Sequence, residues 1–151
     1  MLQLIWAKEF RFFLQKDESA VGQLIVVAAA IIDDTGRVLA AQRTEPSRSA
    51  GMWEFPGGKV EPGETDHDAL VRECTEELAI TVRLGERLGV DIAIAGGAAL
   101  LRVWMASITA GTPLPLEHSE LRWLAADELD SVPWLPADAP LITELRTRLT
   151  T

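Results

Sequence analysis

Cysteine is nearly absent from this chain, and apolar runs of membrane-spanning length are lacking. The single cysteine, Cys74, excludes an internal disulfide, which fits a reducing cytoplasm. No apolar stretch approaches the roughly 18 residues that a transmembrane helix needs. Charged residues interrupt the apolar N-terminal stretch, which is not typical of a signal peptide. We therefore expect a cytoplasmic protein without a membrane partner.

Basic residues are also scarce. The chain has 14 Lys and Arg against 23 Asp and Glu, for a net charge of −9. Because no basic surplus is available to neutralise phosphates, the composition disfavours nucleic-acid polymers and anionic membranes as partners. A small phosphate-bearing substrate stays compatible with this acidity if bound divalent cations reverse the local charge. The 48% hydrophobic content excludes disorder.

The length of 151 residues suits one domain, which we expect to span residues 23–151. Residues 1–22 are interpreted as an N-terminal extension of unknown role. Apolar residues recur there at helical spacing, so an arm or helix could pack on its own domain or on a partner protomer. A helix lying on a membrane surface is the alternative interpretation.

The domain mixes strands with two main helices, which predicts an α/β layered fold. The apolar run 24–32 is typical of a strand buried on both faces, and a turn at Asp33–Gly36 predicts a hairpin with residues 37–42. Thr65 or Asp66 is expected to cap the first helix. Further strands are expected at 52–55, 81–95, 98–109 and 121–124, and the second of these is interrupted near Asp91. A polar loop is expected at 45–51, a helical turn at 126–129, and helices at 65–78 and 139–149.

Three carboxylates share one face of the first helix. Glu73, Glu76 and Glu77 lie at positions i, i+3 and i+4, where like charges repel each other. Each glutamate alone is more simply explained as part of a solvated helix face. Together they form an oxygen-only ligand set, which suits magnesium or manganese. The spaced set therefore predicts a divalent cation site used in phosphate chemistry.

The residues around this cluster add further candidates. Glycines at 57 and 58 allow the backbone to approach a metal or a phosphate closely, and the Gly57 carbonyl is itself a hard oxygen ligand. Arg72 can pair with a neighbouring carboxylate and orient it. Lys59 is a candidate cation for the substrate phosphates.

The segment GGKVEPGETDHDALVRECTEELAI, residues 57–80, resembles the Nudix box. Cys74 departs from the pattern at a position that is usually aliphatic, and we expect it to be a buried core thiol. Ala79 replaces the late glycine of the pattern, which puts the termination of the helix in question. The matching positions are Gly58, Glu64, Arg72, Glu73, Glu76, Glu77 and Ile80.

The resemblance implies an α/β/α sandwich around a mixed β-sheet. It also implies that Glu76 and Glu77 are metal ligands and that Glu73 is a ligand or a general base. Glu64 and Arg72 match residues that shape the loop and the helix. A further acid outside the box often completes such a site. Glu117 fits that position, and Glu120 is the alternative.

Outside the box, the stretches AAQR, WEFPGGK, EHSELRW and WLPADAPLI resemble MutT-like and cytidine-nucleotide pyrophosphohydrolases of the same family. By this resemblance Arg43 contacts the nucleotide, Phe55 lines the pocket and Asp138 contacts the base. An ionised Asp138 would only accept hydrogen bonds. Helix capping alone is the alternative role for Asp138, because it precedes the last helix. His118 is interpreted as a surface or loop residue, although its place beside Glu117 also allows it to line the site.

The resemblance implies a Mg²⁺-dependent nucleoside triphosphate pyrophosphohydrolase that releases a nucleoside monophosphate and pyrophosphate. Mn²⁺ can substitute for Mg²⁺. The expected substrates are oxidised deoxynucleotides such as 8-oxo-dGTP, or cytidine nucleotides, in sanitation of the nucleotide pool. The alternatives are a Nudix hydrolase of ADP-ribose or a sugar nucleotide, and a non-catalytic nucleotide-binding module. We expect a monomer or a homodimer.

Overall fold

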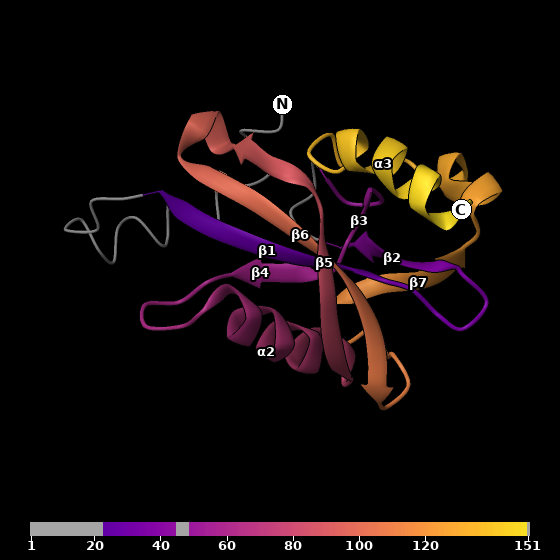
Figure 1. The fold of residues 1–151 in the computed structure, drawn as a ribbon, viewed down its shortest axis with the longest axis horizontal. Coiled ribbons are helices and arrows are strands. Elements are labelled where there is room, and N and C mark those ends of the chain that lie inside the picture. Colours follow the sequence, from indigo (N-terminus) through magenta and orange to yellow (C-terminus); the bar gives the residue numbers. More distant parts are fainter. Residues whose placement is uncertain (1–22, 45–48, 151) are drawn as a thin grey trace.

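The computed structural model describes residues 23–44 and 49–150 (Figure 1). The expected N-terminal extension and part of the expected loop at 45–51 lie outside these residues. Within them, none of the helices is long and apolar enough to cross a bilayer. The mixed α/β fold that we expected is confirmed, and its strands are divided between two sheets.

The larger sheet is built around β1 (Leu24–Ile31) and has the order β4-β1-β6-β5. Strand β1 pairs in parallel with β6 (Ala99–Ala110) and antiparallel with β4 (Gly57–Lys59). Strand β5 (Thr81–Ile94) closes the other side and shifts register near Leu88 and Ile92, close to the expected interruption at Asp91. The smaller sheet is antiparallel with the order β3-β2-β7 and contains β2 (Val38–Arg43), β3 (Trp53–Glu54) and β7 (His118–Leu124).

Helices α2 (Asp66–Leu78) and α3 (Ala139–Leu149) cover opposite faces of the sheet layer, as Figure 1 shows. Successive side chains of β1 alternate between the two faces. Val27 and Ile31 pack in the core beneath α2, whereas Val26 and Ala30 pack in the core beneath α3. Strand β1 is therefore buried on both faces, as its continuous apolar sequence predicted. Two short 3₁₀ helices, η1 (Ala95–Gly97) and η2 (Ala126–Ser131), complete the fold.

The predicted hairpin between the first two strands is wrong. The turn itself forms, because the Asp33 carboxylate accepts hydrogen bonds from the backbone N–H groups of Thr35 and Arg37, each at 2.9 Å. Beyond it β1 and β2 enter different sheets and share only an isolated bridge between Ile32 and Val38. Both edges of β1 are already occupied by β4 and β6, so β2 pairs with β3 and β7 instead.

The ends of α2 show how its sequence limits the helix. Of the two expected caps, Thr65 is the residue used, since its hydroxyl accepts the Asp68 N–H at 3.0 Å. At the other end Ala79 adopts a left-handed conformation with φ 58° and donates its N–H to Thr75 O at 3.1 Å. A left-handed conformation is costly for alanine and free of strain for glycine. The helix therefore ends with a backbone conformation that is typical of glycine and strained for alanine.

We expect Ala79→Gly to raise the free energy of unfolding by about 1 kcal/mol, because it relieves this strain. Ala139→Gly is the matched control: Ala139 is also exposed but is the first residue of α3 and has no left-handed backbone, so glycine there relieves no strain and should not raise stability. Urea unfolding followed by circular dichroism measures both. Equal destabilisation by the two substitutions would contradict the strained termination.

Candidate active site

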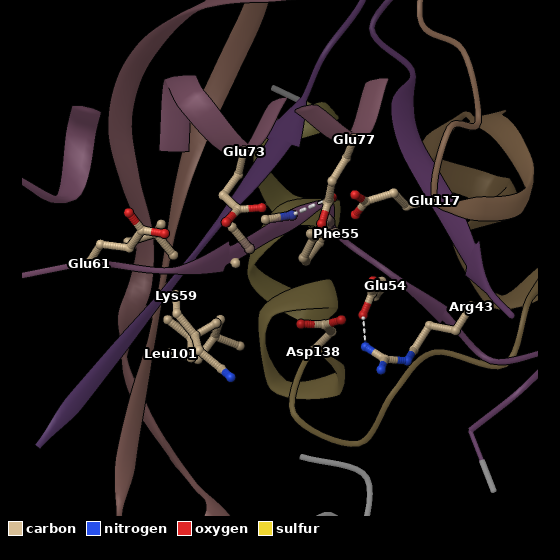
Figure 2. A pocket seen from close by; sticks show the side chains of 15 residues that line it. Arg43, Glu54, Phe55, Lys59, Glu61, Glu73, Glu77, Leu101, Glu117 and Asp138 are labelled. Atoms are coloured by element: carbon tan, nitrogen blue, oxygen red, sulfur yellow. Dashed lines mark hydrogen bonds and ion pairs between the residues drawn. The ribbon is translucent and has the colours of Figure 1, made fainter. Parts of the chain in front are cut away.

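A pocket of about 310 Å³ opens where the two sheets and the two helices meet (Figure 2). Its walls come from β1, β4, the ends of β2 and β3, helix α2, the segment before β7 and the start of α3. Carboxylates and apolar groups share the lining. The sequence-predicted residues that line it are Arg43, Phe55, Gly57, Gly58, Lys59, Glu73, Glu77, Glu117 and Asp138.

The three glutamates of α2 do not share one environment. Glu77 is buried, and the Glu73 side chain is only 15% exposed. The two lie one helical turn apart, and both line the pocket. The Glu76 side chain is 54% exposed and is not part of the lining. Its role as a metal ligand stays a prediction, supported only by its place on the helix.

Two glycines make the close contact between β4 and α2 possible. A Cβ atom at Gly57 would overlap the Val27 carbonyl oxygen of the paired strand, and one at Gly58 would overlap the Glu73 carboxyl group. The Gly57 N–H points to the Glu77 Oε2 atom at 3.3 Å. These glycines therefore make room for the neighbouring strand and for a carboxylate, which is a different requirement from the metal or phosphate approach that we expected.

Arg72 joins the turn before α2 to the acidic face of the helix. Its Nε and Nη2 atoms donate to Glu64 at 2.8 and 2.9 Å, and Nη1 donates to Glu73 at 2.9 Å and Glu76 at 3.2 Å. Nη2 also donates to the Lys59 carbonyl oxygen at 3.1 Å. The hydrogen bond to Arg72 lowers the pKa of the Glu64 carboxyl to about 2. Arg72 therefore positions Glu73 without entering the pocket itself.

Burial disfavours ionisation of the two glutamates of α2 that line the pocket. Burial, followed by the nearby charges of Glu54, Glu73 and Glu117, raises the pKa of Glu77 to about 9. Burial also raises the pKa of Glu73, although its hydrogen bond to Arg72 opposes that shift. A cation beside these carboxylates would favour their charged forms.

Glu117 reaches the same pocket from the segment that precedes β7. Its carboxylate lies beside Glu77 in Figure 2, and its charge raises the pKa of both Glu73 and Glu77. The alternative acid, Glu120, is paired with the exposed Arg122 on β7 and does not line the pocket. Of the two acids outside the helix, Glu117 is the one that can act together with the helix glutamates.

The donor chemistry of this acidic side suits a hard divalent cation, since carboxylate oxygens of Glu73, Glu77 and Glu117 surround one pocket. The side chains are not already gathered around a single point: within the described part of the chain, no group of three His, Cys, Asp or Glu residues is close enough to hold an ion. Arg72 engages Glu73 and Glu76 instead. A cation would therefore draw these oxygens together.

The other end of the pocket holds Asp138. The segment Pro133–Leu135 bonds to the edge of β3, with the Trp53 N–H on Pro133 O at 2.9 Å and the Leu135 N–H on Trp53 O at 2.8 Å. This pairing brings Asp138 against Phe55, whose backbone N–H hydrogen-bonds to the Asp138 carboxyl. The Phe55 ring in turn packs on Trp134.

Asp138 occupies the N-cap position of α3, but its side chain makes no capping hydrogen bond. Capping alone, the alternative role that we considered, is therefore wrong, because the side chain turns into the pocket (Figure 2). Burial, with a contribution from the Glu54 charge, raises the pKa of Asp138 well above its usual range. Burial thus favours the neutral form of the carboxyl, which can donate as well as accept a hydrogen bond, whereas the ionised form only accepts.

A buried chain of three polar side chains crosses the smaller sheet. Arg43 Nη1 donates to Glu54 Oε1 at 2.8 Å, and His118 Nε2 lies 3.0 Å from Glu54 Oε2. His118 is buried, so the surface interpretation is wrong. Glu54 lines the pocket and was missed in the sequence, where its only signal was its place in WEFPGGK before the glycines.

Comparison with known proteins gives a family match over nearly the whole domain. Residues 22–145 match the sequence model of the NUDIX domain. A Mycobacterium tuberculosis protein provisionally named 8-oxo-dGTP diphosphatase 2 is 44% identical over 128 residues, which cover 83% of this chain and 89% of that protein. The CTP pyrophosphohydrolase of Escherichia coli is 42% identical over 121 residues, covering 80% and 90%.

A solved structure agrees with these relatives. The solution structure of the E. coli ORF135 protein has 38% sequence identity and a TM-score of 0.69, and the match covers 83% of this chain and 89% of that one.

The raised pKa of Glu77 predicts how stability changes with pH in a chelating buffer. The folded protein binds the Glu77 proton up to about pH 9, whereas the unfolded chain releases it near pH 4.5. This contribution to stability is therefore complete below pH 4.5 and is lost as the pH rises through 9. We expect Glu77→Gln to remove the loss and to raise the melting temperature at pH 9 by at least roughly 3 °C.

Glu76→Gln is the matched control, because it removes the same charge from an exposed neighbour on the same helix. Its melting temperature at pH 9 should stay close to that of the wild type. Added Mg²⁺ should stabilise the wild type and have little effect on Glu77→Gln. A Glu77→Gln variant that is less stable than the wild type at pH 9 without metal would contradict the assignment of a strained buried carboxyl.

Proposed function

The chain belongs to the Nudix family, and from this membership we propose that it is a divalent-cation-dependent nucleoside triphosphate pyrophosphohydrolase. It releases a nucleoside monophosphate and pyrophosphate. The observation that carries the proposal is the group of buried carboxylates beside a pocket, in a chain 42% identical to a CTP pyrophosphohydrolase. The protein acts in the cytoplasm to remove unwanted nucleotides from the pool.

Nudix hydrolases require a divalent cation, and we propose Mg²⁺ for this one, with Mn²⁺ as a substitute. Glu73, Glu77 and Glu117 would hold it, joined by Glu76 and the Gly57 carbonyl. When bound, such an ion polarises phosphate oxygens and lowers the pKa of water. The residues fit this role because they supply only hard oxygen donors, one of which is a buried carboxyl that a cation would help to ionise.

The side chains divide the remaining work. Glu73 or Glu117 takes the proton of the attacking water, because each carboxylate lines the pocket without being buried as deeply as Glu77. Arg72 orients Glu73 through its 2.9 Å hydrogen bond. Lys59, on β4, contributes positive charge for the phosphate chain. By family resemblance the water attacks the β-phosphorus.

Asp138, Phe55 and Arg43 form the nucleoside end of the pocket. A protonated Asp138 offers a donor and an acceptor side by side, so it complements a base edge that carries an acceptor next to a donor. Cytosine has such an edge at N3 and N4. Oxidation of guanine at C8 creates one at O6 and N7, because N7 gains a hydrogen, whereas both atoms of unmodified guanine are acceptors. Cytidine nucleotides and 8-oxo-dGTP both offer such an edge, and they are the proposed substrates.

We expect a substrate panel to favour these nucleotides. Hydrolysis of 8-oxo-dGTP, dCTP, CTP, dGTP and ADP-ribose should be measured with Mg²⁺ and with chelator, and products identified by mass. The nucleoside monophosphate and pyrophosphate should appear only with Mg²⁺, and Glu77→Gln should lower turnover on the order of a thousandfold. Preferred cleavage of ADP-ribose would move the protein to another Nudix specificity. Tight nucleotide binding without any hydrolysis would instead indicate a binding module.

Substitution of Asp138 tests the base contact separately. We expect Asp138→Asn to keep KM within roughly threefold, because the amide is neutral and also donates and accepts. Asp138→Leu is similar in size but removes both functions, so its KM should rise on the order of tenfold or more while kcat changes less. Steady-state kinetics with the best substrate of the panel measures both. Equal KM values for the two variants would exclude a hydrogen bond from Asp138 to the base.

A further inference from the structure

The segment Gly111–Leu116 follows β6 and leads directly into Glu117, the residue before β7. It lies against the C-terminal end of α2, where the last carbonyl groups of a helix have no partner within the helix. The Leu114 N–H donates to Leu78 O at 2.9 Å, and the Leu116 N–H donates to Glu77 O at 3.2 Å and to Leu114 O at 2.9 Å. The segment is thus bonded to the backbone of Glu77, the residue whose side chain lies deepest in the acidic pocket.

Gly111 makes this contact possible. Its φ of 89° lies in the left-handed region, and a Cβ atom there would come within 2.7 Å of Ala79 O and 3.3 Å of the Ile80 Cα atom. Any other residue would therefore be strained and would also push the segment away from the end of α2. The turn that begins the segment and the residue that ends the helix are packed directly on each other.

Backbone hydrogen bonds hold this segment in place, whereas its two leucine side chains are not buried in the core. Leu114 is 50% exposed and Leu116 is 56% exposed. Pro113 and Pro115 restrict the backbone on either side of Leu114, which lowers the entropy lost when the segment is ordered. At the far end the chain is fixed again, since His118 is buried against Glu54. Glu117 therefore lies between two attachments.

We propose that Gly111–Leu116 is a positioning element that holds the Glu117 carboxylate beside Glu77, so that the cation site is completed only when this segment is docked on α2. The inference rests on the proposed function, because it takes Glu117 as a cation ligand. Gly111 and the N–H groups of Leu114 and Leu116 act through Glu117 and do not touch substrate. The same contact therefore pairs the last carbonyl groups of α2 and completes the cation site.

The test is a double-substitution cycle on cation affinity in the full-length chain. Mn²⁺ binding, measured by electron paramagnetic resonance without nucleotide, should weaken on the order of tenfold in both Gly111→Ala and Glu117→Gln. If Gly111 acts through Glu117, the double variant should bind no more weakly than Glu117→Gln alone. Losses that add in the double variant, or unchanged affinity in Gly111→Ala, would overturn the proposal.

Gly36→Ala is the matched control, because Gly36 has a similar φ of 79° but a Cβ atom added there would have nothing within 4 Å. It should lose stability through backbone strain and keep the Mn²⁺ affinity of the wild type. A weakened affinity in Gly36→Ala would mean that strain alone explains the Gly111 result, and would also overturn the proposal.

A second pair covers the case in which Gly111→Ala does not fold. Leu116→Pro deletes the N–H that bonds Glu77 O, whereas Leu116→Ala keeps it and removes only an exposed side chain. Mn²⁺ affinity should fall in Leu116→Pro and persist in Leu116→Ala, and amide exchange at Leu114 should accelerate only in the proline variant. Equal affinities in the pair would count against the positioning role.

These readouts separate the inference from the proposed function. If the wild type binds Mn²⁺ and the cycle is non-additive but no nucleotide is hydrolysed, the positioning element stands and the enzymatic proposal fails. If nucleotides are hydrolysed but the variants bind Mn²⁺ normally, the enzymatic proposal stands and the positioning element fails.

Discussion

The buried carboxyl group of Glu77 is the feature on which the rest of the site depends. Burial and three neighbouring carboxylates disfavour its charge, while the protein offers it a backbone N–H from Gly57 at 3.3 Å. The fold therefore gathers several carboxyl groups around Glu77, and their mutual repulsion opposes its ionisation. An arrangement of this kind links folding to cation binding, because an ion that binds only the folded form stabilises it by mass action.

The surroundings of this carboxyl group follow from that constraint. Arg72 neutralises the outer acids of the helix but is held by Glu64, so it leaves Glu77 unpaired. The paired glycines of β4 allow the strand to pass directly beneath Glu73. A bulkier strand would displace the helix, and an arginine reaching further would occupy the proposed cation site. The glycines thus keep α2 close to β4, and the contact with Glu64 keeps Arg72 away from Glu77.

Structural features that depend on residues close together in the chain could be predicted from the sequence. The spacing of the glutamates and the Thr65 cap indicated α2, and the bounds expected for α3 match those of the structure. The hairpin was wrong because the occupied edges of β1 depend on strands far away in the chain. The pairing of Glu54 with His118 was missed for the same reason, since 64 residues separate them. Asp138 stands at a cap position, and only the folded chain shows its side chain turned toward Phe55.

The division of the strands between two sheets has an evolutionary consequence. Gly57, Gly58, Glu73 and Glu77 belong to the larger sheet and its helix, whereas Arg43, Glu54 and Phe55 come from the smaller sheet and Asp138 from the start of α3. With the roles that we propose, drift in the second group can retune which nucleotide is recognised while the cation-binding side is inherited intact. One ancestral scaffold can in this way give rise to descendants that differ in selectivity and share a common chemistry.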